Sequence, residues 1–383
     1  MRPTWVEISL PALRHNYEAI RQRVGDTVTV CAVLKADAYG HGVVECARAL
    51  ESVGADWIGV TTTEEGVRLR EAGVGARILL MTGFWRGDQE EIVRQRLTPA
   101  VWDWWQIGAL ETVLTRGPEA QAPFPVHVKV DTGMARLGVP EIYTGLFLRR
   151  LKAAPQIAME GLFTHLSSAD QLQRDTTEQQ VARFAEFEKC AGEHGFRPRY
   201  VHLANSACVA ARPGLWRDMV RPGIALHGYV RPVGHPQLGD LDLKPVLSWK
   251  TRIVSLKEVP AGQPVGYHGT YVTKVPSKLA VLPVGYADGL DRRLSNNGQV
   301  IVRGHCAPLA GRISMDLALA DVTLIEGANV GDEVTLLGSD GKCMISALDH
   351  ARAAGTITHD ILCSIGSRVP RKYVESAGDS ERR

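Results

Sequence analysis

The feature that most constrains this chain is a regular alternation of short apolar runs and helix-like segments between residues 28 and 226. Short apolar runs are typical of buried strands, and amphipathic stretches such as Thr63–Ala72 and Thr177–Glu193 are typical of helices that cover a sheet. The alternation therefore predicts an α/β fold with a parallel sheet. The eight runs are Val28–Leu34, Trp57–Val60, Arg77–Met81, Pro99–Trp102, Phe124–Val130, Ile157–Thr164, Tyr200–Leu203 and Met219–Leu226.

Eight strands with intervening helices favour a (β/α)8, TIM-like barrel. The weakest strand prediction is Pro99–Trp102, for which a loop is the alternative. A doubly wound open sheet is the structural alternative for the whole region, but the turn after the first strand lacks the G-x-G-x-x-G of that fold.

A second domain is expected because the sequence pattern changes near residue 235. Helical spacing disappears there, proline and glycine become more frequent, and short β-like runs follow. We predict a barrel over residues 10–234 and a mostly-β domain over residues 1–9 and 235–373, with the early run Trp5–Ile8 pairing with the β domain. Residues 374–383 are polar and are expected to be a disordered tail. Two domains also suit a chain of 383 residues.

Composition argues against several classes of partner. The 44 basic and 42 acidic residues give no electrostatic case for nucleic acid or an anionic membrane, and no apolar run is long enough to span a bilayer. The seven scattered cysteines form no C-x-x-C pair, which favours reduced thiols and no zinc site. The first ten residues contain no apolar core of the signal-peptide type, so we expect a cytoplasmic protein.

The most chemically suggestive stretch is A-V-L-K-A-D-A-Y-G-H-G, in which a buried strand ends at Lys35. A partly desolvated lysine at a strand end can form a Schiff base or act as a base. The alternative is a lysine that extends from the strand end into water.

Other strand ends carry polar groups as well, and functional groups of barrels lie at these ends. The fifth strand places His127, Lys129 and Asp131 on one face. Arg136 follows in the loop, close enough to fold back and pair with them. A buried ion-pair network with a purely structural role is the alternative for this cluster.

The last strands predict an anion site. His165 ends the sixth strand, although a structural histidine is the simpler interpretation; Asn205 and Ser206 follow the seventh. The eighth runs through Arg221 to the amides of Gly223 and Ile224, where barrels often bind phosphate. A lysine, a phosphate cradle and a ring of arginine and histidine are what a pyridoxal phosphate (PLP) site requires.

The chain also resembles the alanine racemases through nine motifs in that family's order. The resemblance implies an N-terminal (β/α)8 barrel, a C-terminal β domain, PLP, and a head-to-tail homodimer that makes D-alanine for peptidoglycan. The motifs are A-V-L-K-A-D-A-Y-G-H-G, H-V-K-V-D-T-G-M-A-R-L-G, G-L-F-T-H-L, H-L-A-N-S-A, R-P-G-I-A-L-H-G, V-G-Y-H-G-T-Y, V-G-Y-A-D-G, G-R-I-S-M-D and I-L-C-S-I-G-S-R-V-P-R.

Carried over by motif, the resemblance implies a role for individual residues. Lys35 would hold PLP and serve as one catalytic base, and Tyr267 of the partner subunit would be the second base on the opposite face. Arg136 and the partner's Met315 would bind the substrate carboxylate, and Lys129 is carbamylated in some members. The cofactor would meet Tyr39, His165, Asn205, Ser206, Arg221, Gly223, Ile224 and His359, and Tyr286 with His359 would line the entrance.

The chain departs from the family pattern at two histidines, His227 and His359, where tyrosine is usual, and at Ser314, where cysteine is usual. The shorter, titratable imidazole of His359 predicts a wider entrance that admits serine beside alanine. A broad-specificity or serine racemase is therefore one alternative. A PLP-dependent amino-acid decarboxylase and a non-catalytic PLP carrier are the others.

Arg136 or an Arg221–His165 pair would supply the positive field that a tyrosine base needs.

Overall fold

The computed structural model describes residues 2–116, 122–171, 175–230 and 240–375. The predicted domain boundary at residues 234–235, and residues 376–383 of the predicted tail, lie outside these ranges. The chain divides into two compact units, residues 13–38 with 43–244 and residues 1–12, 39–42 and 245–383. Within the described ranges, no helix is long and apolar enough to cross a bilayer.

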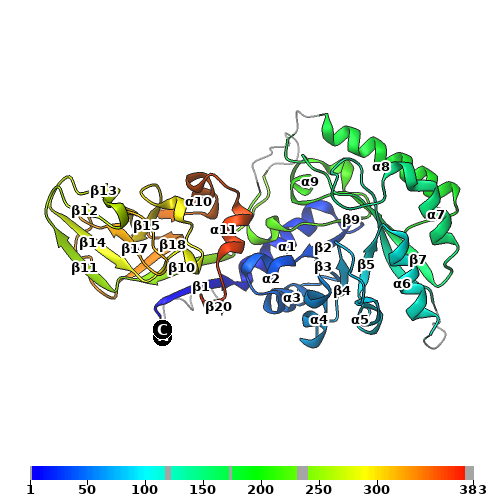
Figure 1. The fold of residues 1–383 in the computed structure, drawn as a ribbon, viewed down its shortest axis with the longest axis horizontal. Helices are drawn as coiled ribbons and strands as arrows, with labels where there is room; N and C mark the ends of the chain where they lie inside the picture. The colour runs from blue at the N-terminus through cyan, green and yellow to red at the C-terminus, as the bar shows by residue number, and fades with distance from the viewer. Residues whose placement is uncertain (1, 117–121, 172–174, 231–239, 376–383) are drawn as a thin grey trace. The chain divides into compact units, whose positions relative to one another are not determined.

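The first of these units is a nearly closed barrel of parallel strands, which Figure 1 shows around β2–β7. A parallel bridge between Asn205 and Arg221 and a 3.1 Å bond from Asp218 N–H to Val201 O join the two end strands. The barrel prediction is therefore confirmed and the open sheet is wrong; the doubtful fourth run is a strand. In spatial order the strands are β9 (Met219–Val220), β2 (Thr29–Val33), β3 (Trp57–Val60), β4 (Arg77–Leu80), β5 (Thr98–Val101), β6 (Phe124–Lys129), β7 (Ile157–Phe163) and β8 (Tyr200–His202).

Helices follow the strands and bury one face each. In α3, Val43, Cys46, Ala47 and Leu50 are buried at helical spacing, and α4 begins at a capping box between Thr62 and Glu65. The helices are α1 (Leu10–Val24), α2 (Lys35–Gly40), α3 (Val43–Glu51), α4 (Thr63–Glu71), α5 (Gln89–Arg94), α6 (Trp104–Leu114), α7 (Thr144–Lys152), α8 (Thr176–Glu193) and α9 (Ser206–Ala211), with 3-10 turns η1 (Glu141–Tyr143), η2 (Pro213–Leu215) and η3 (Ile224–His227).

The second unit is built mainly of antiparallel strands. The predicted early strand lies here: β1 (Thr4–Ser9) pairs antiparallel with β10 (Leu247–Arg252) and parallel with β20 (Arg371–Val374). Its large sheet has the order β16-β15-β18-β10-β1-β20, with β19 beside β18. The other strands of this sheet are β15 (Gln299–Val302), β16 (His305–Pro308), β18 (Glu333–Asp340) and β19 (Cys343–Ile345).

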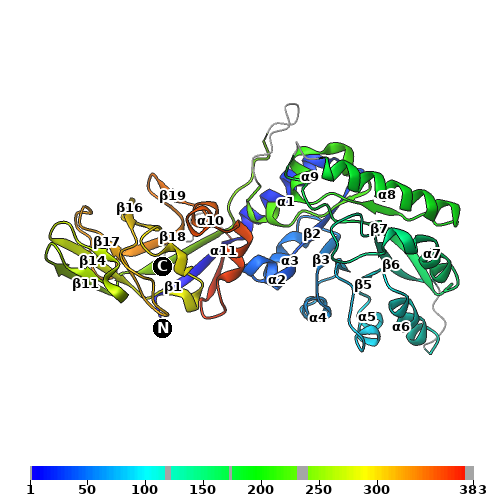
Figure 2. The same ribbon diagram turned by 45° about the horizontal axis from the view of Figure 1, so that its top comes forward.

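A smaller sheet consists of β11 (Ser255–Val259), β14 (Ser277–Leu282) and β17 (Ala318–Asp321), which lie side by side in this order (Figure 2). The segment Leu247–Val259 is divided between the two sheets. Ile253 N–H bonds Asp332 O at 3.0 Å, whereas Val254 N–H bonds Val281 O at 3.0 Å, so the chain crosses between sheets at this point. The remaining elements are β12 (Pro264–Val265), β13 (Tyr271–Val272), α10 (Ala347–Ala354), α11 (Thr358–Ser364), η4 (Tyr267–Gly269), η5 (Tyr286–Asp288) and η6 (Arg292–Leu294).

Candidate active site

The carboxyl ends of the barrel strands bring several predicted site residues to one edge of the first unit. Because all the barrel strands are parallel, their carboxyl ends face the same way. Lys35 comes directly after β2 and its buried neighbour Leu34, and is half-buried. The others at this edge are Lys129, His165, Asn205, Ser206, Arg221, Gly223 and Ile224.

The turn after Lys35 is left-handed. Ala36, Asp37, Ala38 and Tyr39 have φ between 52° and 56°, a region that costs L-residues about 1–2 kcal/mol each. Glu65 of α4 supports the start of this turn, since its carboxylate accepts the Ala36 N–H at 2.6 Å. It also accepts the backbone N–H groups of residues 37, 61 and 62. The strained turn that presents the lysine is thus fastened to the end of β3.

Lys129 is a buried cation among other cations. Its Nζ donates to Met81 O at 3.1 Å and lies 5.4 Å from the Phe163 ring centre. Burial, followed by the charges of Arg221, Arg136 and Lys35, lowers the Lys129 pKa to about 7. A large fraction of this amine is therefore neutral at neutral pH.

The sequence suggests an ion pair between Asp131 and Arg136, but the structure does not show one between these two residues. Its Oδ1 accepts the N–H groups of Gly133, Met134 and Ala135 at 2.9–3.1 Å, which organises the loop that carries Arg136. Arg136 is exposed, and within the described ranges no carboxylate pairs with it. Among the described residues, the Asp131 carboxylate is therefore occupied by the backbone of its own loop and not by Arg136.

His165 is neutral. Burial and then the charges of Arg221, Arg136, Lys129 and Lys35 lower the His165 pKa to about 3. An Arg221–His165 pair therefore cannot supply two positive charges, and the field at this edge comes from the lysines and the guanidinium groups.

Arg221 is held by partners that the sequence did not reveal. NH1 donates to His202 Nδ1 and to His202 O, both at 2.8 Å, and NH2 donates to Thr164 O at 2.7 Å. Burial lowers the Arg221 pKa to about 10, so the guanidinium remains charged at neutral pH. His202 stands at the start of the H-L-A-N-S-A motif, ahead of Asn205 and Ser206, for which the sequence predicts a role.

The loops after β8 and β9 bring backbone amides together. Ser206 Oγ accepts the Gly223 N–H at 2.9 Å and the Ala225 N–H at 3.3 Å, while the Asn205 side chain caps α9. The Ser206 Oγ thus lies where two backbone N–H groups converge. Converging backbone N–H groups also bind phosphate oxygens in other proteins.

The other predicted residues belong to the second unit. Tyr39 is buried, and its ring centre lies 5.8 Å from that of the exposed His359. Tyr267, Tyr286 and Met315 are 66%, 43% and 53% exposed.

The last two lie on one surface of that unit. Tyr286 N–H donates to Ser314 O at 3.0 Å, and a Cβ at Gly285 would lie 2.3 Å from Met315 O. Only glycine fits this close contact between the V-G-Y-A-D-G and G-R-I-S-M-D motifs.

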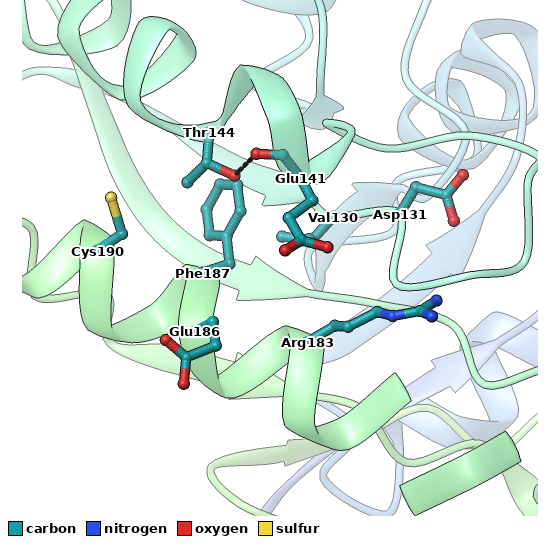
Figure 3. Close-up of a pocket in the computed structure, with 8 residues that line it drawn as sticks. All are labelled: Val130, Asp131, Glu141, Thr144, Arg183, Glu186, Phe187 and Cys190. Atoms are coloured by element: carbon teal, nitrogen blue, oxygen red, sulfur yellow. Dashed lines mark hydrogen bonds between the residues drawn. The ribbon is translucent and has the colours of Figure 1, made fainter. Parts of the chain in front are cut away.

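A cavity of about 160 Å³ lies elsewhere in the first unit, between α7 and α8 (Figure 3). Asp131 and Arg183 lie on one side of it and Cys190 on the other. Neither Lys35 nor Arg221 lines it, so we do not assign it to the candidate site.

Comparison with known proteins gives one consistent result. The family models for the N-terminal and C-terminal domains of alanine racemase match residues 8–231 and 246–373. An alanine racemase of Halothermothrix orenii is 42% identical over 380 residues, 98% of each chain. The solved alanine racemase of Streptomyces lavendulae has a TM-score of 0.90 at 33% identity, covering 100% of this chain and 99% of its own. That of Bacillus anthracis, solved with bound L-Ala-P, has a TM-score of 0.90 at 32% identity, covering 98% and 96%.

Proposed function

This chain belongs to the alanine racemase family, and from that premise we propose how its own residues interconvert L- and D-alanine. The enzyme is a PLP-dependent isomerase. Membership of the family sets aside the decarboxylase and the non-catalytic carrier as alternatives. The roles of individual residues given below are our proposal.

The observation that carries the proposal is the gathering of lysine and arginine side chains at the carboxyl edge of the barrel. Burial, followed by the charges of Arg221, Arg136, Lys129 and Lys35, lowers the His165 pKa to about 3. This donor set fits a ligand that carries both a phosphate and a carboxylate. Bound PLP would supply an electron sink that makes the Cα hydrogen of alanine acidic.

We assign the cofactor contacts by motif. Lys35 would hold the cofactor covalently, and Arg221 would donate to its ring nitrogen without losing its own proton. The Arg221 hydrogen bonds to other described residues use NH1 and NH2. Its Nε–H would therefore be the group that donates to the ring nitrogen of the cofactor. The phosphate would be bound by Tyr39, Ser206, Gly223, Ile224 and His359, with Asn205 and His165 beside the cofactor.

Racemisation removes the Cα hydrogen on one face and returns a hydrogen on the other, so two bases are needed. Lys35 would act on one face and Tyr267 on the other. The substrate carboxylate would be bound by the guanidinium of Arg136 and by the backbone N–H of Met315. The Lys129 pKa of about 7 favours a neutral amine, which is the form that reacts with carbon dioxide to give a carbamate that could pair with Arg136.

We propose that Tyr267 and Met315 complete the site of a second copy in a homodimer. Both side chains are more than half exposed in the single chain, which suits residues that a partner subunit covers. The cell compartment would be the cytoplasm, where D-alanine is made for peptidoglycan; the described residues contain no disulfide, which suits a reducing compartment.

The test of function is incubation with L-alanine, L-serine and L-lysine in D₂O. We expect deuterium at Cα together with inversion for alanine, and a slower reaction for serine if His359 widens the entrance. Carbon dioxide release, or deuterium exchange without inversion, would contradict the two-base assignment.

A further inference from the structure

A line of four side chains runs through the barrel interior from Arg221 to Glu160. Arg221 NH1 lies 2.8 Å from His202 Nδ1, and His202 Nε2 lies 2.9 Å from His127 Nδ1. His127 Nε2 lies 3.7 Å from Glu160 Oε2, an electrostatic contact longer than a hydrogen bond. These groups come from four neighbouring strands or strand ends, β9, β8, β6 and β7.

The two ends of this line, a donor at Arg221 and an acceptor at Glu160, constrain the direction of the hydrogen bonds between them. A guanidinium can only donate, so His202 Nδ1 must be the acceptor. A neutral His202 then carries its hydrogen on Nε2 and donates it to His127 Nδ1. His127 in turn carries its hydrogen on Nε2, which points to the Glu160 carboxylate. Burial lowers the pKa of both imidazoles, which keeps them neutral.

The far end of the line is anchored. Arg77 donates to both Glu160 oxygens, at 2.8 and 2.5 Å, and lies 4.1 Å from the Trp57 ring centre. Burial alone would raise the Glu160 pKa, but His127 and Arg77 lower it to about 2. The carboxylate is therefore charged at every pH at which the enzyme works.

The two imidazole rings cannot easily turn. Phe163 stacks on His202 with ring centres 4.7 Å apart and planes at 8°. The backbone of β7 approaches His127 so closely that a Cβ at Gly161 would lie 2.4 Å from its ring. His127 and His202 are fully buried, so a wrong tautomer would face two hydrogens or two lone pairs toward each other without water to relieve them.

We propose that Glu160 and His127 are positioning residues for racemisation: the carboxylate selects the Nε2–H form of both imidazoles, which leaves His202 Nδ1 free to orient Arg221. The inference rests on the proposed function in that Arg221 is assigned to the cofactor ring nitrogen. None of these positioning residues needs to touch the substrate or the cofactor. Loss of the hydrogen-bonded partners behind metal ligands typically costs about 10–100-fold in affinity or activity, and we expect an effect of that order here.

The first test reads the hydrogens directly. In the holoenzyme labelled with ¹⁵N-histidine, long-range ¹H–¹⁵N spectra should show His127 and His202 as neutral Nε2–H forms, each assigned by its →Gln variant. A His127 that carries its hydrogen on Nδ1 in the unaltered chain would overturn the proposal.

The second test is Glu160→Gln, with Glu160→Asp as the conservative variant. We expect Glu160→Gln to lower kcat for alanine about tenfold or more with little change in KM, to alter the His127 nitrogen signals, and to be partly restored in Glu160→Asp. The matched control is Glu111→Gln, which removes another half-buried arginine-paired carboxylate outside this line.

Equal kcat and unchanged histidine signals in Glu160→Gln and Glu111→Gln would refute the proposal. That result, obtained with an enzyme that racemises alanine normally, would leave the proposed function intact. An unaltered chain that fails to racemise alanine would instead contradict the function itself.

Discussion

Replacing Lys129 with methionine should stabilise the PLP-free protein at neutral and acidic pH. Lys129 is 4% exposed and has three cations near it, so protonating its amine in the folded chain costs free energy that the unfolded chain does not incur. Methionine fills a similar length without a charge.

The size of the effect follows from the pKa. A fall from 10.5 to about 7 corresponds to about 5 kcal/mol, at about 1.36 kcal/mol per pKa unit. Between these pKa values the unfolded chain binds more protons at Lys129 than the folded chain does. The free energy of unfolding of the wild type therefore increases as pH rises. Relative to the wild type, the advantage of Lys129→Met should therefore shrink by about 4 kcal/mol between pH 6 and pH 10.

The assay is urea unfolding of the two PLP-free proteins, followed by tryptophan fluorescence in buffer without carbon dioxide. The control is Lys189→Met, which removes an exposed lysine on α8 and should give a difference that does not change with pH. If the Lys129→Met difference is equally flat, the amine is not desolvated in the folded protein and the reasoning fails.

Four further changes test other parts of the site. Lys35→Ala should abolish the visible absorbance of the lysine-bound cofactor; retained colour would mean that another lysine holds it. Mixing Lys35→Ala with Tyr267→Ala chains should restore part of the activity through one intact composite site, and no recovery would argue against shared sites. His359→Tyr should raise the alanine-to-serine ratio of kcat/KM by about 3- to 10-fold; an unchanged ratio would remove the entrance hypothesis. Glu65→Gln should weaken the left-handed turn by about 1.5–3 kcal/mol, measured as faster hydrogen exchange at Ala36; unchanged protection would show that the turn holds without the carboxylate.

Local pattern was sufficient for the architecture. Apolar runs and helical spacing predicted all eight barrel strands and the helices α4 and α8, because the periodicity of strands and helices is a property of neighbouring residues. The lysine at the end of β2 and the amide-rich turns after β8 and β9 were visible for the same reason. The left-handed turn was not, since four non-glycine residues at positive φ contradict local preference and depend on contacts with Glu65.

The electrostatic state of the site was decided only by the tertiary structure. The sequence supplied Lys129, His165 and Arg221, but their pKa values depend on burial and on charges brought from distant strands. His202 and His127 are 75 residues apart, and only closure of the barrel brings their rings within hydrogen-bonding distance. A sequence specifies which groups are available, whereas desolvation and hydrogen-bond direction arise from through-space neighbours that no local pattern encodes.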